Sequence, residues 1–150
     1  PLEAEVKALH AELGLGDRFL LLGFRRDVHD LMAAADVFTL GSAHEGLPVA
    51  IMEAFAAGLP VVATAVGGVP TQVLDGEHGL VVPPGDSQAL ADALVRLARD
   101  ADLRARLGEA ARVRSGDYDI RGAVRAQQEM YARVARDQSA ATNRERRPHA

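Results

Sequence analysis

The sequence predicts an α/β fold in which a parallel sheet is flanked by helices. Short apolar runs alternate with segments of helical periodicity along the chain, the pattern of a sheet that is covered on both faces. A second observation is the stretch Gly41–Val62, where a loop, a helix and a turn carry two glutamates in largely apolar surroundings. Ligands bind beyond the carboxyl ends of parallel strands, so the loops at that edge are the first place to look for a site.

The N-terminal part of the chain is expected to contain two helices and two short strands. Apolar residues recur at helical spacing over Leu2–Leu13, and this helix ends before a glycine. The apolar run Arg18–Leu22 predicts a buried strand. Asp27 is expected to cap a short helix that reaches Ala34, and Val37–Leu40 is the second predicted strand.

The central helix is predicted over Val49–Ala57. Pro48 suits its first turn, where the missing N–H has no helical acceptor, and Gly58 is expected to end it. Its residues are almost all apolar, which predicts a helix buried on all sides. Glu53 lies in the middle of this helix and needs either an arginine partner or a ligand, because an unpaired buried carboxylate is costly.

The C-terminal part adds two strands and four helices. The apolar segments Val61–Ala63 and Leu80–Val82 predict strands, and Val69–Leu74 predicts a short helix. Three longer helices are expected, from Asp86 or Ser87 to Arg99, over Ala101–Ser115, and over Ile120–Arg136. Residues 1–136 are therefore interpreted as one domain, and the polar, arginine-rich residues 137–150 as a disordered tail.

The composition excludes several kinds of function. The chain has 150 residues, of which 48% are hydrophobic and 25% charged, as in an ordinary globular domain. Its net charge of −4 gives no basic footprint for nucleic acid. The absence of cysteine excludes disulfides and fits a reducing cytoplasm. No histidines and carboxylates have the spacing of metal ligands, and His29 and His78 are expected at the surface. No apolar run is long enough to cross a membrane.

Glu45 and Glu53 are eight positions apart and flank the expected start of the central helix. A helix N-terminus has free N–H groups and a partial positive charge, so it attracts phosphate. Carboxylates are pure hydrogen-bond acceptors and suit hydroxyl donors. The two glutamates around this helix end therefore favour a ligand that carries both phosphates and hydroxyls.

An ordered set of motifs surrounds these glutamates. After Glu53 come Ala54 and Gly58–Val62, and the flanking segments are Phe19–Phe24, Leu31–Phe38, Gly67–Pro70 and Asp75–Asp86. Together they resemble the signature of retaining glycosyltransferases of family 4, in the GT-B group of nucleotide-sugar-dependent enzymes. The resemblance covers roughly residues 1 to 135. It implies a Rossmann-like domain, the partial C-terminal donor-binding domain of a GT-B glycosyltransferase, whose N-terminal domain and early donor-domain segment are absent here.

The resemblance implies retaining transfer of a hexose from a nucleotide diphosphate sugar to a hydroxyl of a glycan, lipid or small molecule. It implies no cofactor and no metal, and we expect this chain alone not to turn over. The expected location is the cytoplasm, and the C-terminal arginines are interpreted either as a solvated tail or as a peripheral contact with the inner face of the membrane. Two alternatives stay open: a non-catalytic nucleotide-binding or subunit-interaction module, and part of a GT-B sugar phosphorylase or epimerase.

The resemblance also assigns roles to residues. It implies that Glu45 contacts the transferred sugar and that Glu53 accepts hydrogen bonds from the ribose hydroxyls. The backbone N–H groups of Leu47, Val49 and Ala50 are candidates to hold the diphosphate and sugar hydroxyls. By itself, each glutamate has a simpler interpretation: Glu53 as an arginine partner and Glu45 as a solvated loop residue.

Two further segments are candidate donor contacts. Phe24 and Arg25 match the region that meets the nucleobase in the family, where Arg25 or Arg26 either stacks on a base or is a solvated side chain. Gly67 and Gly68 form either a simple turn or a loop where backbone approaches closely. Thr71 stands where family members commonly carry a glutamate, so the geometry of this loop is expected to differ.

Overall fold

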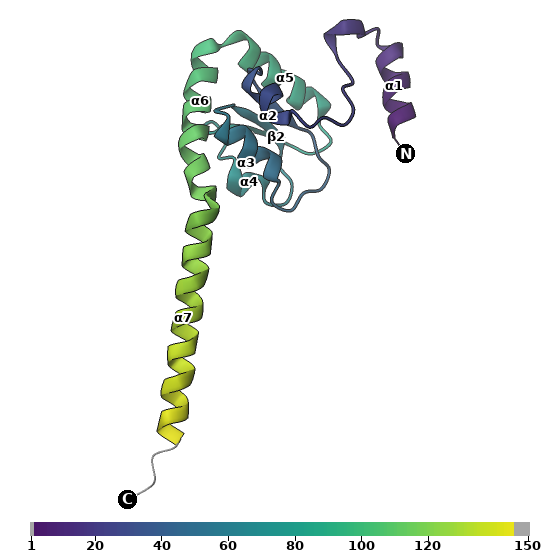
Figure 1. Ribbon diagram of the computed structural model, residues 1–150. Helices are drawn as coiled ribbons and strands as arrows, with labels where there is room; N and C mark the ends of the chain where they lie inside the picture. The colour runs from purple at the N-terminus through teal and green to yellow at the C-terminus, as the bar shows by residue number, and fades with distance from the viewer. Residues whose placement is uncertain (1, 146–150) are drawn as a thin grey trace, which may run out of the picture.

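The centre of the fold is a sheet of three short, valine-rich strands. In the computed structural model, which describes residues 2–145, the strands β1 (Phe38–Leu40), β2 (Val61–Thr64) and β3 (Gly79–Val82) pair in parallel in the order β1-β2-β3 (Figure 1). The register places Val62 opposite both Thr39 and Leu80. These strands confirm the three that the sequence predicts from residue 37 onward.

Side chains of β2 alternate between two apolar clusters, one on each face of the sheet. Val61 and Ala63 pack with Ile51 and Phe55 in the first cluster. Val62 packs in the second cluster, whose other members include Leu97. Because both faces of the strand are covered, all four of its residues are buried, which explains the apolar run over its first three residues.

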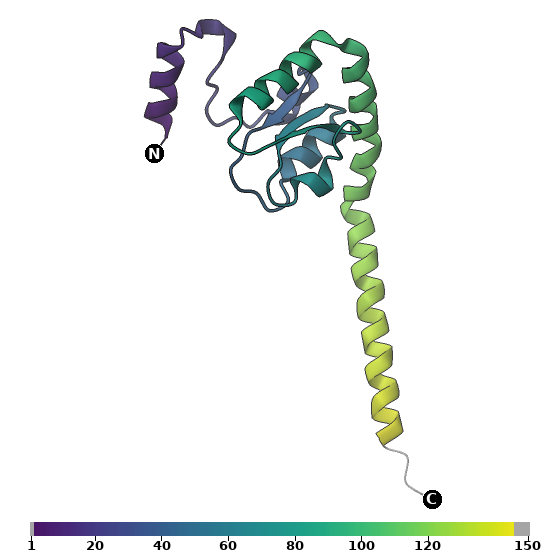
Figure 2. The ribbon, with the colours of Figure 1, turned by 180° about the vertical axis from the view of Figure 1, so that it is seen from behind.

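Helices cover both faces of this sheet, as the sequence predicts. The first face carries α2 (Val28–Ala33), α3 (Val49–Ala56) and α4 (Val69–Gln72), and the second carries α5 (Ser87–Arg99) (Figures 1 and 2). α6 (Ala101–Arg114) packs against both α3 and α5. Asp86 and Asp100 cap α5 and α6, since their carboxylates accept hydrogen bonds from Ala89 N–H at 2.9 Å and Leu103 N–H at 2.8 Å.

The predicted strand Arg18–Leu22 is wrong. The chain forms a short 3₁₀ turn, η1 (Gly16–Arg18), and then an extended link that pairs with no strand among the described residues. Phe19 to Leu22 are all exposed. An extended segment becomes a strand only when a neighbouring strand takes its backbone hydrogen bonds, and the described sheet ends at β1.

The first helix, α1 (Glu3–Glu12), forms close to where its apolar spacing predicts it. Figures 1 and 2 show α1 set apart from the sheet and joined to it by the extended link. None of its residues is buried, so the apolar stripe of Leu2, Val6 and Leu9 stays uncovered in the described chain. His10 joins this helix to the link, because its Nε2 lies 2.8 Å from the carbonyl oxygen of Phe19.

The last helix is longer than the sequence predicts. After η2 (Ser115–Tyr118), α7 (Ile120–Glu145) extends away from the sheet as one continuous helix (Figure 1). The predicted end at Arg136 is therefore wrong, and residues 137–145 of the predicted disordered tail are helical. Residues 146–150 lie outside the described chain. In the described part, no helix has the length and apolar character that a membrane span requires.

Candidate functional site

Three loops leave the carboxyl ends of the parallel strands at one edge of the sheet. Residues 41–48 follow β1, residues 65–68 follow β2, and residues 83–86 follow β3. The first two loops and the start of α3 carry six predicted site residues: Glu45, Leu47, Val49, Ala50, Gly67 and Gly68. The sheet therefore gathers most of the predicted site at one edge.

Glu45 is held by hydrogen bonds that lead back to the sheet. The hydroxyl of Ser42 donates to Oε1 of Glu45 over 2.7 Å. The hydroxyl of Thr64, at the buried end of β2, donates in turn to the carbonyl oxygen of Ser42 over 2.6 Å. The Glu45 carboxylate is thus linked to the neighbouring strand through two short contacts, which restrict its orientation.

Gly67 and Gly68 pack directly against the loop that carries Glu45. Gly67 has a φ of +51°, and a Cβ at this position would overlap the carbonyl oxygen of Glu45. The N–H of Gly68 donates to the carbonyl oxygen of Gly46 over 2.6 Å. The glycine pair is therefore a site of close backbone approach, and the backbone that approaches is the Glu45 loop. A direct contact of these glycines with a ligand stays a prediction.

Gln72 fixes the start of α3 from the core. Its side chain is fully buried, and its Nε2 donates to the carbonyl oxygen of Pro48 over 3.3 Å. That oxygen also accepts from the N–H of Ile51 in the first turn of the helix. Among the described residues, Oε1 of Gln72 is one of two buried side-chain polar atoms without a hydrogen-bond partner.

Glu53 is half-buried on a helix that is covered on one side only. Ile51, Ala54 and Phe55 are buried in the core, whereas Val49 is 62% exposed. The prediction that α3 is buried all round is therefore wrong for the described chain, because helices cover only its core-facing side. Val49 and Ala50 begin the helix, so their N–H groups precede its first internal hydrogen bonds and point outward at its end.

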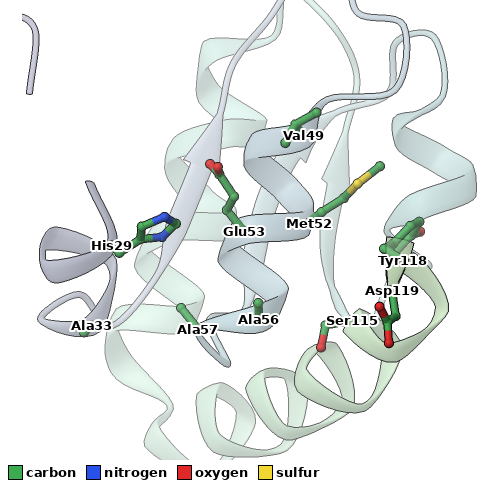
Figure 3. Close-up of a pocket in the computed structure, with 10 residues that line it drawn as sticks. All are labelled: His29, Ala33, Val49, Met52, Glu53, Ala56, Ala57, Ser115, Tyr118 and Asp119. Carbon is green, nitrogen blue, oxygen red and sulfur yellow. The ribbon is translucent and has the colours of Figure 1, made fainter. Parts of the chain in front are cut away.

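An open cleft of about 550 Å³ runs along the uncovered side of α3. Its lining comes from α2, α3 and the turn before α7: His29, Ala33, Val49, Met52, Glu53, Ala56, Ala57, Ser115, Tyr118 and Asp119. Figure 3 shows Glu53 projecting from the middle of α3 on the side of His29, while Met52 extends toward Tyr118. Of the predicted site residues, the cleft contains Glu53 and Val49 and leaves out Glu45.

Phe24 and Arg25 lie outside both the cleft and the edge loops, on the link before α2. Phe24 is 88% exposed. The guanidinium of Arg25 donates through Nε to Asp27 over 2.8 Å and also contacts its second carboxylate oxygen. This hydrogen bonding raises the pKa of Arg25 and lowers the pKa of Asp27. Asp27 accordingly precedes α2 without capping it through its side chain. The nucleobase role of both candidates stays a prediction.

His78 is a core residue, so the expectation that it lies at the surface is wrong. Its side chain is 5% exposed and packs against Phe55, with 5.7 Å between the ring centres. Nδ1 accepts a hydrogen bond from the N–H of Leu74 over 3.3 Å. Burial lowers the pKa of His78. In the described part of the chain, no three His, Asp or Glu side chains gather in a way that could hold a metal ion.

Ser42, Thr64 and Gln72 are the site-forming residues that the sequence analysis did not single out. Ser42 precedes Glu45 by three positions, a spacing at which a hydroxyl reaches a carboxylate in a turn. Gln72 is a polar residue between Val69 and Val73 in an apolar segment, which is a recognisable anomaly. Neither signal identifies the carbonyl or carboxylate that the side chain contacts.

Comparison with known proteins decides the family. The sequence profile described as Glycosyl transferases group 1 matches residues 1–114, which is most of the chain. The chain belongs to this family. A relative from Rhizobium meliloti strain 1021, the lipopolysaccharide core biosynthesis glycosyltransferase LpsE, is 40% identical over 101 residues, covering 67% of this chain and 30% of the relative.

Solved structures of glycosyltransferases share the fold. Sucrose-phosphate synthase from Thermosynechococcus elongatus superposes with a TM-score of 0.82 at 31% identity, covering 89% of this chain and 34% of that one. HepE from Anabaena, in complex with UDP-glucose, superposes with a TM-score of 0.78 at 33% identity, covering 88% of this chain and 36% of that one. The parallel sheet with its flanking helices thus matches the Rossmann-like C-terminal domain of GT-B glycosyltransferases. The chain spans about a third or less of the curated relatives it matches.

Proposed function

We propose that this chain forms the nucleotide-sugar half of the donor site in a retaining glycosyltransferase of family 4. The complete enzyme transfers a hexose from a nucleotide diphosphate sugar to a hydroxyl of a glycan, a lipid or a small molecule. An N-terminal domain beyond this chain supplies the acceptor site. Membership of the glycosyl transferases group 1 family supports this class of reaction.

The arrangement of Glu45 and Glu53 around the start of α3 is the observation that carries the proposal. Glu45 is oriented by Ser42 at the carboxyl edge of the sheet, and Glu53 extends from α3 into the open cleft. The first N–H groups of α3, from Val49 and Ala50, lie between them in the chain. The helix end attracts a diphosphate, and a carboxylate on each side of it can accept hydrogen bonds from hydroxyls. This arrangement suits a ligand that carries hydroxyl groups at both ends of a diphosphate.

Each group has a proposed role in the reaction. The Glu53 carboxylate accepts hydrogen bonds from the ribose hydroxyls, and the N–H groups of Leu47, Val49 and Ala50 hold the diphosphate and sugar hydroxyls. Glu45 positions the sugar while the diphosphate leaves and the acceptor hydroxyl attacks from the same face. The helix end stabilises negative charge on the departing diphosphate without a metal or another cofactor. These carboxylates differ from a glycosidase pair, which must flank a single glycosidic bond.

The donor base is proposed from a structural neighbour. HepE from Anabaena is described in complex with UDP-glucose, and UDP is accordingly the first nucleotide to test with this chain. The proposed location is the cytoplasm. Contact with the inner face of a membrane rests on arginines near the C-terminus, of which Arg146 and Arg147 lie outside the described residues.

Calorimetric titration with UDP, GDP and ADP tests the proposal. We expect heat with one of these nucleotides, and we expect Glu53→Gln to weaken its binding by about tenfold or more, because a hydrogen bond to a charged acceptor is lost. Glu109→Gln is the matched control, since Glu109 is exposed on α6 and pairs with Arg112. No heat with any nucleotide from the folded chain contradicts a half-site in these residues, and unchanged affinity in Glu53→Gln contradicts the ribose role.

A further inference from the structure

We propose that Gln72 is a positioning residue that sets the first turn of α3 relative to the Glu45 loop. This inference rests on the proposed function, because that turn supplies the N–H groups assigned to the donor. In the described chain, the side chain of Gln72 forms its hydrogen bond with the carbonyl group of Pro48 and acts on the turn through that group.

One short helix, α4, contacts both the Glu45 loop and the start of α3. α4 begins directly after Gly68, whose N–H holds the carbonyl oxygen of Gly46, and ends at Gln72, whose amide holds the carbonyl oxygen of Pro48. One rigid turn of helix therefore contacts the chain on both sides of Leu47. The spacing between the Glu45 backbone and the start of α3 follows from the length of α4.

The burial of Gln72 indicates a role other than stability. A fully buried amide needs partners for both its donor and its acceptor, and Oε1 has none among the described residues. A half-satisfied polar group in an apolar core is less stable than an apolar side chain of the same shape. Val69, Val73 and Ile51 are buried neighbours in this part of the core, so an apolar residue at position 72 matches its surroundings. In the described chain, the one hydrogen bond of this amide is therefore spent on the carbonyl group at the start of α3.

Gln72→Met separates positioning from stability, because methionine keeps the length of glutamine and removes both polar atoms. We expect the urea midpoint of the variant to be equal to or above that of the wild type. We also expect the amide hydrogen of Ile51, which donates to the carbonyl oxygen of Pro48, to exchange about tenfold faster, since the loss of one hydrogen bond loosens the turn. Exchange is measured by NMR on the full chain without ligand, with amides of α5 as the internal reference.

Two further variants sharpen the comparison. Gln88→Met is the matched control, because Gln88 lies on the exposed side of α5 and bonds only to Asp92 in the described chain. Gln72→Glu retains a donor at low pH, since a buried carboxylic acid stays neutral and its O–H reaches the same carbonyl oxygen. At pH 5 we expect this variant to keep the slow exchange of the wild type.

The outcomes decide between the alternatives. Unchanged exchange of the Ile51 amide in Gln72→Met overturns the proposal. A lower urea midpoint with faster exchange throughout the core also overturns it, because it assigns Gln72 an ordinary structural role. A titration of the same variants with UDP measures their affinity for the nucleotide. We expect Gln72→Met to bind UDP about tenfold more weakly than the wild type. If the wild type binds no nucleotide, the proposed function fails, whereas the exchange data still decide whether Gln72 positions this turn.

Discussion

Gly67 combines a backbone conformation and a contact that other residues cannot reproduce. Its φ of +51° is unfavourable for side chains, and a Cβ would overlap the Glu45 carbonyl oxygen. We expect Gly67→Ala to lower the free energy of unfolding by about 3 kcal/mol or more, because strain and overlap add. Urea denaturation measures the loss.

Gly85→Ala is the matched control for this change. Gly85 also has a positive φ, of +77°, but apart from its chain neighbours no heavy atom of the described residues lies within 4 Å of its Cβ position. Its replacement adds backbone strain without a clash and is expected to cost about 1–2 kcal/mol. Equal losses in the two variants would mean that the Glu45 loop moves aside at no cost, and would argue against a tightly held site.

His78 makes stability depend on pH. Because burial lowers the pKa of His78, the unfolded chain binds a proton near pH 6.5 more readily than the folded chain does. The stability from this residue is complete above the unfolded pKa and decreases as the pH falls through about 6.5 toward the lower folded value. We expect the urea midpoint of the wild type to decrease more between pH 7.5 and 5.5 than that of His78→Gln.

His29→Gln provides the comparison for the histidine experiment, because His29 is exposed on α2. Its pH dependence of stability should follow that of the wild type. A His78→Gln variant whose midpoint falls as steeply as the wild type's would show that other groups control the acid sensitivity.

The two candidate glutamates can be predicted from the sequence, whereas the residues that hold the surrounding loop and helix in place cannot. Glu53 is recognisable because its sequence neighbours are apolar. Glu45 is recognisable because it precedes Glu53 by eight positions and lies just before the predicted start of the helix. Thr64 and Gln72 act across separations of 22 and 24 residues. The sequence around a hydroxyl or amide does not indicate which distant residue it will contact, because only folding brings the two together.

Helix caps offer a test at the level of elements. The Asp100 carboxylate accepts a hydrogen bond from Leu103 N–H over 2.8 Å at the start of α6, which packs against α3. We expect Asp100→Ala to cost about 1 kcal/mol of unfolding free energy and to lower the melting temperature. Asp27→Ala is the control, because Asp27 precedes α2 but pairs with Arg25 instead of capping. A larger effect at Asp27 would contradict the assignment of the caps.

Elements whose neighbours are present in the described chain are predicted well from the sequence. The strands β1 to β3, the helices α3 and α5, and the Asp86 cap follow from apolar runs, spacing and side-chain chemistry. The segment Arg18–Leu22 has the composition of a strand, but a strand depends on a neighbour that composition does not reveal. The end of α7 is predicted too early because its polar residues are also typical of disorder, although arginine, glutamine and alanine all favour helix.

At the scale of the molecule, apolar surface is concentrated where the described chain has no covering layer. The stripe of α1, the link Phe19–Leu22 and the outer side of α3 are all exposed. Within the described chain, helices cover both faces of the sheet. The matched segments cover 30% and 27% of the length of two relatives in the family.

α7 determines how the molecule moves in solution. Its 26 residues form a rod about 39 Å long at the usual rise per residue, and Figure 1 shows that this rod projects from the body. A globular chain of this length has a radius of gyration of about 15 Å. With the rod attached, mass lies far from the centre, so the protein tumbles anisotropically and encounters more friction than a sphere of equal mass. Rotation about the long axis stays fast while end-over-end rotation slows.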